Sequence, residues 1–357
     1  MPPTTIELGI DTFGDMTVDP DGVPQHPARV IRDVVDQAVL ADQVGVDVIG
    51  LGEHHRDDFA LSAPEIVLAA IAARTERIRL STAVTVLSSD DPIRVYERFA
   101  TLDAVSKGRA EIIVGRGSFT ESFPLFGFDL RDYEVLFDDK LSLLAELLTE
   151  EPVTWSGRTR PPLRDQVVHP RTESGGIRTW VGVGGSPESV VRAARHRMPL
   201  MLAIIGGEPA RFAPFVDLYH RALGEFGHDS LPVGCHCPGH VADTDEQAIE
   251  EAWPHHRVLH GRIAAERGWS PMTRSDFEAQ VGPRGALYVG SPETVARKIA
   301  ATSRALGLSR FTLKIGSGPM PDALQRRSIE LFGAEVIPRV RELLADGASQ
   351  PPGTMAP

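Results

Sequence analysis

The stretch IRLSTAVTVLSSDDPIRVYERFATLDAVSKGRAEIIVG, residues 78–115, holds one full repeat of the pattern that runs along this chain. Residues 78–87 form an apolar run, which predicts a buried strand. Pro92 stands at the first turn of a helix expected over residues 92–105, a position that favours proline. Residues 110–114 predict the next strand. Strand, helix and strand therefore follow one another with short connections.

The same alternation continues on both sides of this stretch. Further strands are predicted at residues 6–11, 46–51, 179–183, 200–205, 233–241 and 310–315, and helices at 29–44, 64–75, 132–148, 187–197, 210–226, from Asp245 onward, 292–306 and 321–344. Apolar strands flanked by amphipathic helices imply a parallel sheet covered on both faces. Eight such units favour a (β/α)8 TIM-type barrel, with a doubly wound sheet as the alternative.

Two polar segments interrupt the alternation, at residues 151–178 and 268–284. We interpret them as insertion loops of a single barrel domain over residues 1–345. Long loops in compact folds are usually functional, so we expect them to contact the substrate. Residues 346–357, rich in proline and glycine, are predicted to form a disordered tail.

The composition indicates an ordinary soluble globular protein, with 42% hydrophobic and 24% charged residues. The net charge of −12 argues against nucleic-acid or anionic-membrane binding, because both require a basic face. Neither a membrane-length apolar run nor a signal sequence is seen. Cys235 and Cys237 cannot form a disulfide framework. A reduced, cytoplasmic setting is therefore expected.

Glycines and polar residues follow the predicted strands, where ligands bind in parallel α/β folds. Gly184 and Gly185 allow the backbone to approach a ligand closely, and Ser186 can cap the helix that follows. The free N–H groups of the first turn of that helix would bind a phosphate, and Arg116 could bind the same phosphate. The alternative is an ordinary capped turn, with Arg116 in a surface ion pair.

Histidines stand at two further strand positions. His54 and His55 follow a strand, where one of them could move a proton. Adjacent strand residues face opposite ways, so only one should face the site; the alternative is a structural histidine. In CHCPGH, residues 235–240, alternation places the two cysteines on one face and His236 on the other. The spacing offers no complete zinc ligand set, so no metal is expected.

Taken in order along the chain, several segments resemble the bacterial luciferase-like family of flavin-dependent monooxygenases, from Ile6 to about Leu344. The segments are Leu51–His55, Thr82–Leu87, Asp91–Arg94, Leu102–Arg109, Gly115–Gly117, Gly184–Ser186 and Gly290–Glu293. Each is weak alone, but the ordered set is specific.

The resemblance implies a (β/α)8 barrel, usually dimeric, that binds reduced FMN at the carboxyl ends of its strands. His54 would lie near the isoalloxazine and assist the oxygen chemistry. Ala83-Val84 would lie under the flavin, where the family often has a non-proline cis peptide. The residues implied to hold the phosphate are Arg116, Gly184, Gly185, Ser186 and Ser189.

Other residues are candidates for the substrate pocket. Aromatic side chains near strand ends could line an apolar pocket: Phe13, Phe119, Phe123 and Tyr133. His55, His236 and His240 could face the substrate.

The chain also departs from the family pattern. Glu134 aligns where bacterial luciferases have a second phosphate arginine, and a carboxylate there would repel a phosphate. Ile204 stands where those enzymes have a tryptophan near the flavin. The chain is therefore not a light-emitting enzyme by close match.

The sequence thus predicts a two-component flavin-dependent monooxygenase, with reduced FMN from a separate flavin reductase and O2 reacting with an organic substrate. A homodimer is the family expectation. One alternative is hydride transfer with a deazaflavin coenzyme, although its oligoglutamate tail suits an acidic chain poorly. Two more are a non-catalytic flavin-binding protein and a metal-dependent hydrolase using Cys235, His236 and His240.

Overall fold

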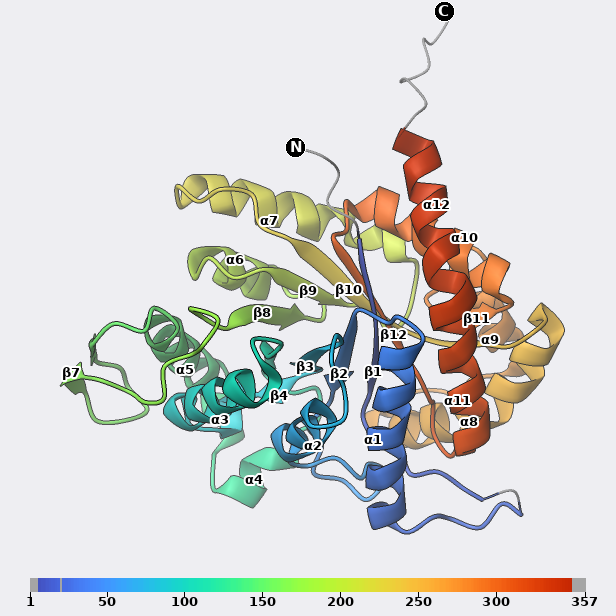
Figure 1. The fold of residues 1–357 in the computed structure, drawn as a ribbon, viewed down its shortest axis with the longest axis horizontal. Coiled ribbons are helices and arrows are strands. Elements are labelled where there is room, and N and C mark those ends of the chain that lie inside the picture. Colours follow the sequence, from blue (N-terminus) through green and yellow to red (C-terminus); the bar gives the residue numbers. More distant parts are fainter. Residues whose placement is uncertain (1–5, 20, 349–357) are drawn as a thin grey trace, which may run out of the picture.

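Parallel strands form a barrel wall in the computed structural model, which describes residues 6–19 and 21–348 (Figure 1). Within that part, the eight predicted strands are β1 (Glu7–Thr12), β2 (Val48–Leu51), β3 (Arg79–Thr82), β5 (Glu111–Gly115), β8 (Arg178–Val183), β9 (Leu200–Ala203), β10 (Val233–Val241) and β12 (Arg310–Lys314). The sheet order is β3-β2-β1-β12-β10-β9-β8-β5-β4. A parallel bridge between Leu80 and Ala110 brings its two ends together. The barrel prediction is confirmed, and the doubly wound sheet is not formed.

Two short strands of the main sheet were not predicted. The expected strand at residues 78–87 is split into β3 and β4 (Thr85–Val86), with a cis peptide bond between Ala83 and Val84. At the break, the Thr82 hydroxyl donates to the Ile113 carbonyl (3.0 Å) and accepts from the Ile113 N–H (3.1 Å). The Thr82 side chain thus replaces the backbone hydrogen bonds to β5 that are missing at the break. β11 (Tyr288–Gly290) pairs with the end of β10.

Helices cover the outside of the barrel. They are α1 (Pro27–Gln43), α2 (Pro64–Ala72), α3 (Pro92–Ser106), α5 (Tyr133–Leu147), α6 (Pro187–Arg195), α7 (Ala213–Glu225), α8 (Asp245–Arg267), α10 (Pro292–Leu306), α11 (Asp322–Leu331) and α12 (Ile337–Ala348). Proline opens several of them, and Asp91 caps α3 by accepting from the N–H groups of Ile93 and Arg94. Among the described residues, none of these helices is long and apolar enough to cross a membrane.

The last predicted helix, residues 321–344, is interrupted. A π-helical turn over Phe332–Val336 separates α11 from α12. Gly333 lies in this turn, where a Cβ atom would stand 2.3 Å from Val44 at the end of α1, so the close approach needs glycine. α12 continues to Ala348, past the predicted start of the tail at Asp346. The rest of that predicted tail, residues 349–357, lies outside the described residues.

The two insertions contain secondary structure. Residues 151–178 form an antiparallel hairpin of β6 (Val153–Trp155) and β7 (Leu163–Gln166), which projects beyond α5 in Figure 1. The hairpin connects a helix to the next strand, so it belongs to the amino-terminal end of the barrel. Residues 268–284 contain α9 (Arg274–Val281).

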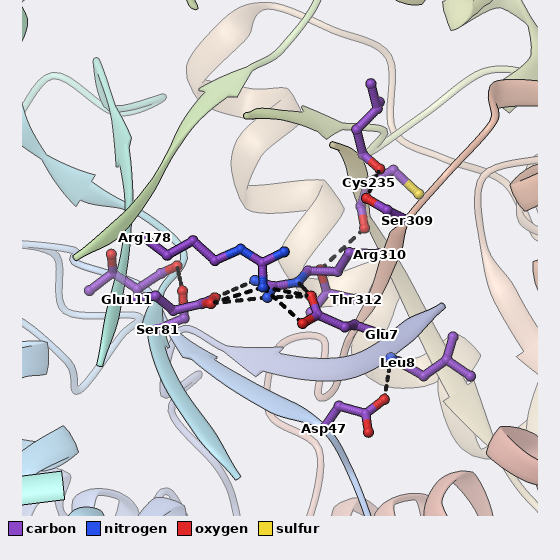
Figure 2. A network of polar contacts seen from close by, with 12 residues as sticks. Glu7, Leu8, Asp47, Ser81, Glu111, Arg178, Cys235, Ser309, Arg310 and Thr312 are labelled. Carbon is purple, nitrogen blue, oxygen red and sulfur yellow. Dashed lines mark hydrogen bonds and ion pairs between the residues drawn. The ribbon is translucent and has the colours of Figure 1, made fainter. Parts of the chain in front are cut away.

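A buried network of charges closes the amino-terminal end of the barrel (Figure 2). The Arg310 side chain, 1% exposed, contacts the carboxylates of Glu7 (2.6 Å) and Glu111 (3.0 Å). Arg178 donates a further hydrogen bond to Glu7 (2.8 Å). Burial alone would lower the pKa of Arg310, but the Glu111 and Glu7 carboxylates outweigh it and raise that pKa. The charges at this end are therefore paired and structural.

Candidate active site

A cavity of about 700 Å³ occupies the carboxyl-terminal end of the barrel. Its size is that of a pocket for a cofactor or a small organic ligand. Small residues on neighbouring strands leave the space open. Gly50 and Gly182 line the cavity, and a Cβ atom on Gly182 would lie 3.1 Å from Val84. The barrel interior, which is usually filled by side chains, is therefore partly vacated here.

His54 lies on this cavity, inside a cage of aromatic rings. Its ring stacks on Phe59 with centroids 4.4 Å apart and meets Phe13 and Phe119 edge-on at 4.7 and 5.4 Å. Burial, followed by the positive charge of Lys314, lowers the pKa of His54 to about 3. The buried Nε2 atom has no hydrogen-bond partner within the described chain. His54 is thus a neutral imidazole with a nitrogen available for a ligand.

His55 also lines the cavity, so the expectation that only one of the two histidines would do so is wrong. β2 ends at Leu51, and the chain beyond it no longer alternates like a strand. His55 Nε2 pairs with Glu53 Oε1 at 3.0 Å, and Glu53 Oε2 accepts from the Val86 N–H at 2.8 Å. The pair links the loop after β2 to β4.

The Ala83–Val84 peptide and the glycine turn before α6 border the same space. Ala83, Val84, Arg116 and Gly184 line the cavity, whereas Gly185, Ser186 and Ser189 are not among its lining residues. Ser186 caps α6 by accepting from the Ser189 N–H at 3.3 Å. A Cβ atom at Gly184 would meet nothing within 4 Å. The structure therefore brings Arg116 and the start of α6 to one corner of the cavity. The space next to Gly184 is open to a ligand.

Arg116 lines this corner of the cavity, and Arg192 of α6, which does not line the cavity, shares its contact with Glu134. Arg192 also pairs with Asp138. The Glu134 carboxylate pairs with Arg116 through one oxygen, and its other oxygen lies 3.0 Å from Arg192. Arg192 is 7% exposed and also donates to the Ser189 hydroxyl at 3.3 Å. The sequence analysis missed Arg192. The available signal was its spacing, because a residue three positions after Ser189 lies on the same helix face.

The remaining predicted residues are divided. Phe13, Phe119, Tyr133 and His236 line the cavity, whereas Phe123 is fully buried in the protein core. His240 does not line it: its Nε2 bonds Glu251 of α8 at 2.7 Å, and it is 2% exposed. The reason lies in β10, which pairs with β12 only as far as Pro238 and then follows β11. The strand leaves the barrel wall before His240.

The two cysteines also lie away from the cavity. Cys235 and Cys237 are buried with their sulfur atoms 3.9 Å apart, while His236 faces the cavity, as alternation predicted. Across residues 6–19 and 21–348, no group of three or more His, Cys, Asp or Glu side chains is placed to hold a metal ion.

The outer wall of the cavity comes from α8 and the second insertion. Leu259 and Ile263 of α8 and Trp269, Met272 and Gln280 of residues 268–284 line it. The expectation that this insertion would help form the pocket therefore agrees with the structure. No residue of the described hairpin insertion, 151–178, lines the cavity.

Arg56 joins three segments around the mouth of the cavity. Its guanidinium contacts Asp58 (2.9 Å), Glu121 (2.5 Å) and Glu266 (2.5 Å). It also lies 4.3 Å above the ring of Phe119, which packs against His54. Hydrogen bonds to Glu266 and Asp58 outweigh burial and raise the pKa of Arg56. This contact holds the loop after β5 over His54.

Comparison with known proteins places these features in a family context. A family model described as luciferase-like monooxygenase matches residues 12–310. The uncharacterized protein y4vJ of Sinorhizobium fredii is 26% identical, with 90% of this chain and 95% of that protein covered. The 4-hydroxyprotoasukamycin monooxygenase of Streptomyces nodosus subsp. asukaensis is 29% identical, with 93% and 94% covered. The alkanal monooxygenase alpha chain of Photorhabdus luminescens is 26% identical, but the match spans 62% of this chain and 61% of that relative.

Solved structures share the fold. Monooxygenase RslO1 from Streptomyces bottropensis has a TM-score of 0.78 at 24% identity, with 93% of this chain and 99% of that chain covered. The oxygenating constituent of 3,6-diketocamphane monooxygenase from Pseudomonas putida, in complex with FMN, has a TM-score of 0.76 at 18% identity, covering 94% and 99%. The coenzyme F420-dependent tetrahydromethanopterin reductase from Methanopyrus kandleri has a TM-score of 0.69 at 20% identity, also covering 94% and 99%.

Proposed function

The chain belongs to the family of luciferase-like monooxygenases, and on that premise we propose that it is a flavin-dependent monooxygenase using reduced FMN and O2 on a small organic substrate. The observation that carries the proposal is the cavity itself. It joins a corner that holds Arg116 and the glycine turn before α6, with Glu134 paired to the arginine, to a buried histidine with a free nitrogen. Its apolar walls would keep water away from the reacting groups.

The residues present fit FMN. Gly184 leaves open space beside the first turn of α6, and Gly185 adopts φ +116°, which only glycine tolerates easily. Arg116 and Arg192 would bind the phosphate there, and Ala83-Val84 would support the ring. Bound FMN would supply the electrons and the atom that reacts with O2. His54, neutral above pH 3 because burial lowers its pKa to about 3, would hydrogen-bond near the ring without carrying charge.

The proposal extends to the partners of the enzyme. A separate flavin reductase would supply the reduced cofactor, as the resemblance to the luciferase-like family implies. A homodimer and a cytoplasmic location complete the proposal.

Hydride transfer with a deazaflavin is the second candidate. It is favoured by the fold shared with the coenzyme F420-dependent reductase and with an F420-dependent secondary alcohol dehydrogenase. The carboxylates near the corner would disfavour the longer acidic tail of a deazaflavin more strongly than the single phosphate of FMN. Glu134 and Glu188, which accepts from the Ser186 hydroxyl at 2.8 Å, would repel an acidic coenzyme tail.

Titration with oxidised FMN, anaerobically reduced FMN and a deazaflavin coenzyme tests the proposal. We expect reduced FMN to bind most tightly. Arg116→Gln and Arg192→Gln should each weaken FMN binding about tenfold, the usual cost of losing a charged hydrogen bond. Arg195→Gln, on the exposed side of the same helix, is the matched control. Preference for the deazaflavin would support the second candidate, and absence of binding to any flavin would contradict both.

A non-catalytic flavin-binding protein is distinguished by one variant. His54→Ala should abolish the flavin-dependent consumption of O2 in an enzyme and leave flavin binding largely intact. A storage protein would show no turnover that the variant could remove.

A further inference from the structure

His236 and Asp11 form a hydrogen-bonded pair in the cavity wall. The Nδ1 atom of His236, on β10, lies 2.7 Å from Oδ2 of Asp11, on β1. The Asp11 side chain is 2% exposed, and its Oδ1 atom has no partner within the described chain. The imidazole lies parallel to the Phe13 ring, with centroids 5.9 Å apart. Carboxylate and ring stacking together fix the orientation of the histidine.

This pairing determines which nitrogen is available. A carboxylate only accepts hydrogen bonds, so Nδ1 must carry the proton and Nε2 keeps its lone pair. Across the described residues, no protein group bonds Nε2, and the side chain lines the cavity. A polar ligand that bonds this atom must therefore donate a hydrogen bond to it. If His236 then becomes an imidazolium, Asp11 is placed to stabilise it.

The other charged groups around the cavity are already engaged. Lys314 Nζ binds Asp15 at 2.8 Å, and Arg310 is held by Glu7 and Glu111. Both cations line the same cavity, but each is already neutralised by its carboxylate partners, so neither offers a free charge to a ligand.

The other histidines that line the cavity differ from His236. Within the described chain, they either have no carboxylate partner or bond a carboxylate through Nε2. Burial lowers the pKa of His54 to about 3 and that of His256 to about 4, so neither takes up a proton near neutral pH. His260 also lines the cavity, and its Nδ1 atom is buried without a partner in the described chain. His55 uses Nε2 to pair with Glu53.

We propose that His236, positioned by Asp11, is a catalytic proton acceptor for a hydroxyl group of the substrate, and that the substrate is an apolar molecule with an acidic hydroxyl, such as a phenol or an enol. This inference rests on the proposed function and narrows its substrate class. The apolar part would lie against the outer wall, which includes Leu259, Ile263 and Trp269.

The proton-transfer step is simple. The substrate O–H bond breaks, its electron pair stays on oxygen, and Nε2 binds the proton. Nδ1–H stays bonded to Asp11, so the pair becomes an imidazolium beside a carboxylate. The electron-rich oxyanion is the more reactive form toward oxygenation, and the proton returns to the product or to solvent after the reaction.

The test uses 4-nitrophenol, whose phenolate and phenol forms absorb at different wavelengths. The full-length protein, with and without oxidised FMN, is titrated one pH unit below the pKa of the free probe. We expect bound probe to show a phenolate-to-phenol ratio at least tenfold above that of free probe. In His236→Gln this ratio should fall at least tenfold, and Asp11→Asn should lower it by a smaller factor.

A matched control is available on the same strand. His240 bonds Glu251 at the same 2.7 Å distance but does not line the cavity, so His240→Gln should keep the wild-type ratio. The NMR signal of the His236 Nδ1 proton gives a second measurement, which Asp11→Asn should shift upfield if Asp11 positions the ring.

The proposal would be overturned if the wild-type protein did not bind the probe, or if His236→Gln kept the wild-type ratio. Fluorescence titration of FMN with the same samples separates this result from the proposed function. FMN binding with no ionised probe contradicts only the role of His236. An ionised probe without flavin binding contradicts only the flavin-dependent function.

Discussion

The carboxylate of Glu134 is paired with the guanidinium of Arg116 at the corner of the cavity where a phosphate would bind. Glu134 is 59% exposed, so its side chain can move away when a ligand enters. An anion that binds there must compete with this carboxylate.

Replacing Glu134 by glutamine should therefore tighten FMN binding. We expect about a tenfold lower dissociation constant, because a competing charge is removed from both arginines. Riboflavin, which lacks the phosphate, should bind the variant and the wild type equally. Glu146→Gln, at an exposed position on the same helix, is the control. Equal tightening for riboflavin would show that the effect does not involve the phosphate.

Filling the open space at Gly184 should block the cofactor without harming the fold. A Cβ atom there meets nothing within 4 Å, so Gly184→Leu should weaken FMN binding at least tenfold by steric exclusion and change the free energy of unfolding by less than about 1 kcal/mol. Fluorescence titration and urea unfolding measure the two quantities. Unchanged FMN affinity would place the phosphate elsewhere.

His54 should make the protein less stable in mild acid. Its folded pKa of about 3 lies below the unfolded value, so between about pH 3 and 6.5 the unfolded chain binds a proton that the folded chain does not. Stability is thus lost as pH falls through this range and is unaffected above it. His54→Gln should reduce the slope of unfolding free energy against pH, between pH 5 and 6, by about 1 kcal/mol per pH unit. Urea unfolding measures this slope. Exposed His220→Gln should leave it unchanged, and an equally steep slope in His54→Gln would contradict the prediction.

Breaking the buried network at the other end of the barrel should cost stability rather than activity. Glu111→Gln leaves the buried Arg310 with one carboxylate fewer and should lower the free energy of unfolding by about 3–5 kcal/mol. Glu7→Gln should cost less, because Glu7 is 27% exposed. The double variant Glu111→Leu, Arg310→Met, which removes both charges, should recover part of the loss. Urea unfolding of the three variants checks this order, and equal losses for Glu7 and Glu111 would contradict it.

The barrel could be predicted because its strands are continuous apolar runs, each followed by a helix with one apolar face. The hydrophobic pattern could not show where a strand or a helix is interrupted. The split between β3 and β4 depends on the Ala83–Val84 peptide and on the Thr82 hydroxyl, and the π-helical turn depends on the contact of Gly333 with Val44. Such features follow from tertiary packing, which no local periodicity records.

The candidate site was predictable to a similar degree. Glycines and histidines at strand ends identified the cavity, because the carboxyl ends of parallel strands converge. Asp11 and Arg192 were missed because their partners are far away in the sequence. Asp11 meets His236, and Arg192 meets Glu134, only once the barrel has folded. His240 was also expected to face the substrate, but β10 turns toward β11 before it reaches that residue.

The hairpin of β6 and β7 has a practical consequence. It belongs to the end of the barrel opposite the cavity, and none of its described residues contacts that space. Its tip, around Pro161 and Pro162, is therefore a place to attach a tether, an affinity tag or a fused reductase by genetic insertion, leaving the chemistry at the far end undisturbed.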